Sequence, residues 1–242
     1  MSSKGINGPI WIEHPSVQGV LEIAEEILSE NRVLNIDNLY TIAKRRLKIP
    51  RRGLLRIIQF LLDKKILVEG SKYTKETVLS NKVRKQIYKF ILDENGVNFS
   101  LIKKNIAAVQ GTGQVVWHLE MLLKFRFIKK LKIGNYTIFM PIETSYEVGS
   151  LNFFLKDQIN EKIVILLGNK EKIKRSDVYK IIEEKREQVY YRIRILNENK
   201  IILFNKDSEK EIMINPKFHK IISELLPKMS EKYKNINFLL QS

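Results

Sequence analysis

The densest group of chemically capable side chains is the basic run KRRLKIPRRGLLR at positions 44–56. A guanidinium presents planar N–H donors that match both a phosphate group and the edge of a guanine base, so this run favours a nucleic acid as partner. The competing interpretation is the solvated face of an amphipathic helix. We prefer the first, because the charge gathers at one edge of a predicted helix–turn–helix. The residues expected to bind DNA here are Arg45, Arg46, Lys48, Arg51, Arg52, Arg56 and Gln59.

Residues that commonly carry catalysis are sparse. The chain has no cysteine, and its histidines, His14, His118 and His219, have no second histidine or carboxylate at metal-ligand spacing. No phosphate-binding glycine loop, zinc-protease motif or dinucleotide fingerprint is present, and the Gly-Thr-Gly segment 111–113 is too short to cradle a nucleotide. We interpret His118 as a hydrogen-bonded structural residue. We therefore expect no enzyme activity, no cofactor and no metal site.

The charge balance points in the same direction. The 242 residues include 43 Lys+Arg against 27 Asp+Glu, a formal net charge of +16, and the basic excess extends over residues 1–78, 79–148 and 149–242 alike. Such a surplus favours polyanionic partners, although lysine is also a common solubilising surface residue. No apolar run is long enough to span a bilayer, and the first residues lack the apolar stretch of a secretory signal. We expect a cytoplasmic, nucleoid-associated protein.

The elements that must position these residues form a repeat. In the middle third, a long helix, a short helix, a glycine-containing turn and a second helix precede a hairpin with Gly134-Asn135 at its tip. The last third follows the same order, with a charged hairpin tip, and the first third has the helices but a short or absent hairpin. The segments are, in the middle third, 79–95, 99–107, 108–113, 114–125 and 126–141, and in the last third, 161–170, 176–184, 185–200 and 200–216.

Alignment of the second helices supports the repeat, because Gln114, Trp117 and Leu122 superpose on Gln188, Tyr191 and Leu196. Leu54, Ile58 and Leu61 fall at the same core positions in the first copy. We predict a mainly α fold with short β-hairpin wings, built as three tandem winged helix-turn-helix units at 1–78, 79–148 and 149–242, the last with a C-terminal helix. The expected boundary and cap residues are Pro50, Pro141 and Pro216, and Ser80 and Ser176.

Residues 80–141 resemble archaeal winged helix-turn-helix transcriptional regulators of the ArsR/MarR type. The shared features are an Arg-Lys-x-Ile-Tyr helix, Asn-Gly-Val before the short helix, Gly-Thr-Gly opening the next helix, and Trp-His-Leu within it. The resemblance implies binding of double-stranded DNA through the second helix and the wing, usually as a dimer and without catalysis. Many such regulators sense metals through Cys and His clusters, which this chain lacks, so metal sensing is not implied.

The outward face of the middle copy's second helix mixes polar and apolar residues. Gln114 suits adenine and Lys124 suits phosphate or guanine, whereas Trp117 fits either thymine methyl groups or a protein partner. We expect Thr112 to cap this helix, with backbone amides open to a phosphate. The corresponding wing residues should add affinity and salt dependence rather than specificity. They are Lys129, Lys130, Lys132 and Asn135.

The outward face of the last copy's second helix is less suited to DNA, because Glu187 and Glu198 accompany Gln188, Tyr191, Arg194 and Ile195. We expect it to serve homodimerisation, a partner protein or domain packing. The leading hypothesis is a double-stranded DNA-binding transcriptional regulator. The alternatives are a winged-helix protein-interaction scaffold, similar to ESCRT-II or polymerase-associated subunits, and a protein that binds RNA or the nucleoid without sequence preference.

Overall fold

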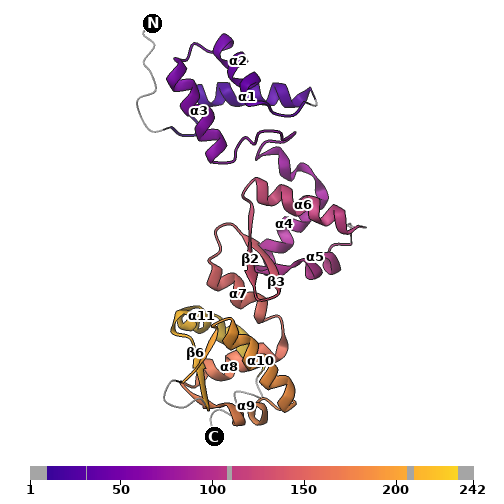
Figure 1. The fold of residues 1–242 in the computed structure, drawn as a ribbon, viewed down its shortest axis with the longest axis vertical. Helices are drawn as coiled ribbons and strands as arrows, with labels where there is room; N and C mark the ends of the chain where they lie inside the picture. Colours follow the sequence, from indigo (N-terminus) through magenta and orange to yellow (C-terminus); the bar gives the residue numbers. More distant parts are fainter. Residues whose placement is uncertain (1–9, 31, 108–110, 206–209, 234–242) are drawn as a thin grey trace. The chain divides into compact units, whose positions relative to one another are not determined.

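The computed structural model describes residues 10–30, 32–107, 111–205 and 210–233 (Figure 1). The chain forms two compact units. Unit 1 comprises Met1–Lys89 with Ile106–Phe127, and unit 2 comprises Phe90–Asn105 with Ile128–Ser242. The division falls inside one helix, α4 (Lys82–Glu94). The three-unit organisation expected from the sequence, with its boundaries after residues 78 and 148, stays a prediction.

Unit 1 begins with three helices, α1 (Pro15–Ser29), α2 (Ile36–Arg46) and α3 (Arg51–Asp63). Their apolar stripes meet in one core that includes the fully buried Val20, Leu39, Leu54, Ile57 and Leu61. Side chains cap the first two helices, because His14 Nδ1 accepts from the Ser16 amide at 3.1 Å and Asn35 Oδ1 accepts from the Asn38 amide at 2.8 Å. Pro50 occupies the turn before α3, as expected.

The segment after α3 forms no strand within the described residues 64–81. Instead it closes against the loop before α2, where the Leu34 amide donates to the Ser71 carbonyl at 2.9 Å and the Gly70 amide donates to the Leu34 carbonyl at 2.8 Å. A 3₁₀ helix, η1 (Thr77–Ser80), follows. Val68 and Val78 pack with Phe125, which ends α6 (Thr112–Lys124), in a second, smaller core of unit 1.

Unit 2 contains two small antiparallel sheets of three strands each. In the first, β1 (Val97–Asn98) and β2 (Ile128–Ile133) both pair with β3 (Tyr136–Pro141). In the second, β4 (Ile173–Lys174) and β5 (Ile202–Phe204) both pair with β6 (Glu211–Ile214). The predicted hairpin tip is confirmed, since Gly134 has φ +54° between β2 and β3.

The remaining helices of unit 2 are α5 (Phe99–Asn105), α7 (Tyr146–Phe154), α8 (Gln158–Asn169), α9 (Arg175–Ile181), α10 (Arg186–Glu198), η2 (Pro216–Phe218) and α11 (His219–Lys232). The series α4-β1-α5-α6-β2-β3 therefore recurs as α8-β4-α9-α10-β5-β6, with the same strand order in each sheet. This mainly helical chain with two three-stranded sheets is compatible with winged-helix architecture.

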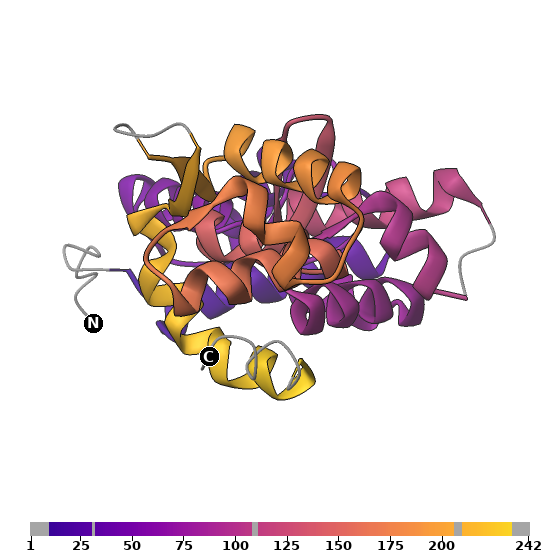
Figure 2. The same ribbon diagram turned by 90° about the horizontal axis from the view of Figure 1, so that it is seen from below.

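The core of unit 2 joins its first hairpin to the helices that follow. Ile133, Ile138 and Met140 are buried in one cluster with residues of α7, α8 and α10. The hairpin and α7 approach so closely that a Cβ on Gly149 would lie 2.6 Å from Met140 Sδ. The C-terminal helix α11, yellow in Figure 2, packs on α8, where Lys232 Nζ and Tyr233 Oη lie 2.7 and 2.6 Å from Glu161 Oε2.

Three expected helix caps are wrong. Ser80 lies in η1 and donates to the Thr77 carbonyl, while Asn81 Oδ1 accepts from the Arg84 amide at 3.0 Å and caps α4. Ser176 lies inside α9, and Thr112 is the first residue of α6 after the cap position Gly111. In each case the chain enters the helical conformation at a position different from the one that hydroxyl-residue preference indicates. Parts of the expected turn 108–113 and of the last hairpin tip lie outside the described residues.

Candidate nucleic-acid interface

The end of α2 and the start of α3 carry an exposed group of cations. Lys44, Arg45 and Arg46 occupy the last turn of α2, where positive charge complements the helix dipole. Arg51 and Arg52 open α3, whose cap position is Pro50 with no side-chain hydrogen bond. We call this group the first basic edge, and its exposed members are Lys44, Arg45, Arg46, Lys48, Arg51, Arg52, Arg56 and Gln59.

Members of the first basic edge, among them Arg46 and Gln59, already have partners within the chain. Arg46 forms an ion pair with Glu26 of α1, and Gln59 Nε2 donates to Asp63 Oδ1 at 2.8 Å. The Arg46 and Glu26 side chains are 49% and 58% exposed, so water screens their interaction and it contributes at most about 1 kcal/mol. A phosphate group can therefore compete with Glu26 for Arg46 at low cost.

On α6, Gln114, Glu120 and Lys124 are exposed, as the helical periodicity predicts. Trp117 is only 46% exposed, because its ring lies over the Arg84 guanidinium at 4.7 Å and against the His118 ring at 4.9 Å. Met121 is half-buried and packs on the small core of unit 1. The solvent-exposed face of α6 therefore includes less of Trp117 and Met121 than the sequence alone indicates.

Arg84 is fully buried, and sequence reasoning missed it. Its guanidinium carbon lies 5.0 Å from the ring centroid of Tyr73 and 4.7 Å from that of Trp117. Its Nη1 donates a hydrogen bond to the Val78 carbonyl at 2.5 Å. Nε and Nη2 have no hydrogen-bond partner among the described residues, and burial lowers the pKa of this guanidinium. One signal was available, since Arg84 shares the inward stripe of α4 with Ile87 and Ile91.

His118 is buried, as expected of a structural residue, but one of its ring nitrogens lacks the hydrogen bond that we expected. It is 2% exposed, and its Nδ1 has no hydrogen-bond partner in the part of the chain that the structure describes. Burial lowers the pKa of this imidazole, and the positive charge of Arg84 lowers it further. The ring is therefore held in its neutral form beneath Trp117, and it makes no contribution to an exposed binding surface.

The second helix of each repeat, α3, α6 and α10, begins without a side-chain hydrogen bond to its first turn. Such a terminus leaves backbone N–H groups available to an external acceptor, and the helix dipole favours an anion there. The short helix α9 shares this property, whereas α1, α2, α7 and α8 have a side-chain cap. The α-helix cap positions without a side-chain bond include Pro50, Gly111, Lys174 and Lys185, and those with one include His14, Asn35, Ser145 and Asp157.

The expected wing residues lie on the β2–β3 hairpin of unit 2. Lys130, Lys132 and Asn135 are exposed, whereas Lys129 is partly covered and its ammonium lies 4.8 Å from the Tyr146 ring centroid. At the tip, Tyr136 packs on Phe153 of α7 with ring centroids 5.3 Å apart. One face of this hairpin is thus committed to the core, and the other carries the two exposed lysines.

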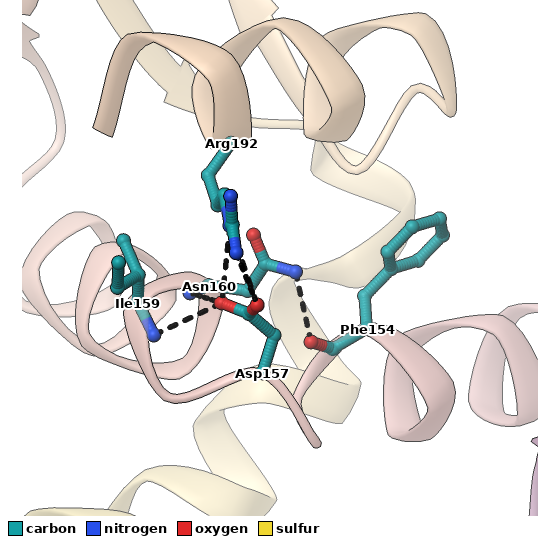
Figure 3. Close-up of polar contacts among 5 residues, drawn as sticks. All are labelled: Phe154, Asp157, Ile159, Asn160 and Arg192. Carbon is teal, nitrogen blue, oxygen red and sulfur yellow. Dashed lines mark hydrogen bonds and ion pairs between the residues drawn. The ribbon is translucent and has the colours of Figure 1, made fainter. Parts of the chain in front are cut away.

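On α10, Gln188, Tyr191 and Arg194 are exposed, while Ile195 packs on the core of unit 2. Arg192 turns inward to Asp157, which also accepts from the Ile159 and Asn160 amides at 3.1 and 3.0 Å and so caps α8 (Figure 3). The Arg192 Nη2–Asp157 Oδ2 distance is 2.9 Å. Burial alone would raise the pKa of Asp157, but the bonds from Arg192 and the amides outweigh it and lower that pKa.

The predicted site residues are thus divided between the units. Unit 1 holds the first basic edge together with Thr112, Gln114, Trp117 and Lys124 on α6, and unit 2 holds the four hairpin residues. Within the described residues, no group of three or more His, Asp or Glu side chains has metal-site geometry, and no helix is long and apolar enough to cross a bilayer.

Comparison with known proteins gives one informative relationship. The chain is 30% identical over 115 residues to an uncharacterised HTH-type transcriptional regulator of Methanocaldococcus jannaschii. The aligned part covers 47% of this chain and 29% of that relative. No protein-family model matches the chain. This partial similarity relates the chain to HTH-type regulators, a class consistent with its helices and small sheets.

Proposed function

We propose that this protein is a transcriptional regulator that binds double-stranded DNA through winged-helix units. The observation that carries the proposal is the first basic edge, where exposed Arg and Lys side chains surround the uncapped start of α3. Cations of this kind neutralise phosphates, and the free amides of a helix terminus add a site for one of them. The similarity to an HTH-type regulator supports the same role.

In this proposal the residues divide by task. Arg52 and Arg56, one helical turn apart on α3, enter the major groove, while Arg45, Arg51 and Lys48 hold the phosphate backbone. On α6, Gln114 reads a base and Lys124 contacts phosphate, and the amides that follow Gly111 bind another phosphate near Thr112. Lys130 and Lys132 follow the backbone as a wing. A regulator of this kind acts in the cytoplasm, at the nucleoid, and has no catalytic activity or cofactor.

A second candidate is a protein-interaction scaffold, because apolar side chains lie exposed on the same helices. Leu55 on α3, Val116 and Trp117 on α6, and Tyr191 on α10 are each between 45% and 47% exposed. Exposed aromatic and aliphatic residues are enriched in protein interfaces. In this case α10 is the element that would join a partner protein or a second copy of the chain.

The two candidates respond differently to salt and to charge removal. We expect a labelled random-sequence duplex to bind with an affinity that falls steeply as salt rises, with a log–log slope steeper than about −4. Arg52→Ala with Arg56→Ala should weaken that binding about tenfold or more without lowering the melting temperature. Lys85→Ala with Lys89→Ala removes the same charge from exposed positions one turn apart on α4 and is the matched control. Absence of duplex binding at low salt would favour the scaffold.

A further inference from the structure

Unit 2 has a pocket whose lining differs from the first basic edge, because it combines aromatic rings with arginines. It has a volume of about 520 Å³ and lies on the outward face of α10, beside the start of α9 and the strand β5. Three of its six lining residues are aromatic and two are arginines. We call it the tyrosine–arginine pocket, lined by Arg175, Glu187, Tyr190, Tyr191, Arg194 and Phe204.

The aromatic and guanidinium groups of this pocket are stacked on one another. The Arg175 guanidinium lies 4.1 Å from the Tyr190 ring centroid, and that of Arg186 lies 5.1 Å from the same ring. Tyr179 packs edge-on against Tyr190 with centroids 6.5 Å apart. Tyr190 is therefore held in place before any ligand arrives, which reduces the entropy lost on binding.

Arg175 has unused hydrogen-bonding capacity. Its Nε is buried and has no hydrogen-bond partner, and no carboxylate pairs with its guanidinium within the part of the chain that the structure describes. The ion pair between Arg194 and Glu198 is exposed and long, with 3.8 Å between Nε and Oε1, so another anion can readily replace Glu198. Glu187 is the one acidic residue of the lining, so the pocket carries a net positive charge.

Most of the pocket's aromatic and cationic wall is absent from the middle copy of the repeat. When α10 is aligned with α6 and α9 with α5 by their first residues, Tyr191 has an aromatic equivalent in Trp117, but Tyr190 has no aromatic equivalent and the two arginines of the wall have no cationic equivalent in the middle copy. A feature that merely stabilised the shared fold would be expected in both copies. The residues that replace Arg175, Tyr190 and Arg194 are Phe99, Val116 and Glu120.

We propose that the tyrosine–arginine pocket binds an unpaired nucleotide of a single-stranded nucleic acid. Aromatic rings and guanidinium planes accept the face of a base, which a duplex hides in its stack, while the remaining guanidinium donors bind the phosphate. Lys174 and Lys185, the exposed residues that precede α9 and α10, extend the positive charge for neighbouring phosphates. An acidic peptide would use the arginines but not the three rings. This site is separate from the first basic edge.

The test is fluorescence anisotropy of the full chain with a labelled short oligothymidylate. We expect Tyr190→Leu, which keeps an apolar side chain but removes the ring, to weaken single-strand binding about fivefold or more. Arg194→Ala, at an exposed position where loss of folding is not expected, should have an effect of similar direction. Lys220→Ala, an exposed cation of α11, is the control for lost charge. Circular dichroism establishes that each variant is folded.

Three results would overturn the proposal. One is equal single-strand affinity of the wild-type chain and both pocket variants. Another is that thymidine monophosphate displaces the labelled oligothymidylate as effectively as the unlabelled strand does, at equal concentration of phosphate groups. This result would indicate a site for free nucleotides. The third is equally effective displacement by an oligoglutamate peptide. Duplex binding by the same variants is measured in parallel, so failure here is distinguished from failure of the first basic edge.

Discussion

The stack of Tyr73, Arg84 and Trp117 shows how one residue can belong to both the core and the surface. Trp117 lies on the outward face of α6, and the part of its ring that is not exposed covers a buried guanidinium. A cation over an indole ring contributes about 0.5–2 kcal/mol, more when the cation is desolvated. The position therefore has a structural task whether or not the exposed half of the ring contacts DNA or a partner.

We expect Trp117→Ala to lower the free energy of unfolding by roughly 1–3 kcal/mol, because it removes the aromatic contact and leaves a cavity beside Arg84. Thermal or urea unfolding followed by circular dichroism measures the change. Val116→Ala is the control, since Val116 is equally exposed on the same helix and should change stability by less than about 1 kcal/mol. Equal stability of Trp117→Ala and wild type would mean that the stack does not hold the helix.

His118 should make the protein less stable in mild acid. Its pKa in the folded chain is below the ordinary 6.5, so between the two values the unfolded chain binds more protons than the folded one. The stability that the neutral His118 contributes is thus fully present above a pH of about 6.5, and it is lost progressively as the pH drops below that value. Urea unfolding at a series of pH values down to about 5, above the carboxylate range, isolates this effect. His118→Asn should flatten the dependence, and an unchanged slope in that variant would contradict the assignment.

At the scale of elements, the starts of α3, α6 and α10 are notable because no side chain at the cap position bonds to their first turn. Side chains cap α1, α2, α7 and α8 through an imidazole, a carboxamide, a hydroxyl and a carboxylate acceptor respectively, so the chain does use side-chain caps elsewhere. The second helix of each repeat lacks a side-chain cap, and in the last repeat the short helix α9 lacks one too. A phosphate at that position would complete the hydrogen bonds of the first turn.

Gly111 allows this interpretation to be tested, because its φ of −132° is open to any residue and an added Cβ would meet nothing within 4 Å. Gly111→Asn and Gly111→Asp should each cap α6 and raise the free energy of unfolding by a few tenths of a kcal/mol. Gly111→Asp should also weaken duplex binding more than Gly111→Asn, because its charge repels a phosphate. Equal duplex affinity of the two variants would remove the start of α6 from the interface.

The helices and hairpins were predictable because their signals are local. The apolar stripe of α6, the Gly134-Asn135 tip and the stop at Pro141 all depend on residues a few positions apart. The inward stripe of α4 indicated that Arg84 could be buried, but its partners Tyr73 and Trp117 were not predictable, since they come from other segments of the chain. The same holds for the tyrosine–arginine pocket, where Arg175 reaches Tyr190 only after α9 and α10 have packed together.

At the scale of the whole molecule, the net charge of +16 overstates what is available to a ligand. Several cations are tied to carboxylates within their own units, including Lys162 to Glu184 at 2.6 Å and Arg192 to Asp157 at 2.9 Å. Composition indicates a polyanionic partner, but it does not separate committed cations from free ones. Among the described residues, the structure shows two different groups, one rich in exposed cations and one that combines cations with aromatic rings.

These two groups predict different salt dependences for duplex and single-strand binding by the intact chain. Removing Arg45 and Arg51, which hold phosphates in the proposed interface, should make the log–log slope for duplex binding shallower by roughly 2, because each lost phosphate contact releases about 0.9 fewer counterions. The Tyr190→Leu variant removes no charge, so its single-strand affinity should fall with the slope unchanged. Anisotropy titrations of both variants against both ligands across a salt series give all four slopes. If Tyr190→Leu altered the slope, or if the arginine variants weakened both ligands equally, the two surfaces would be acting as one site.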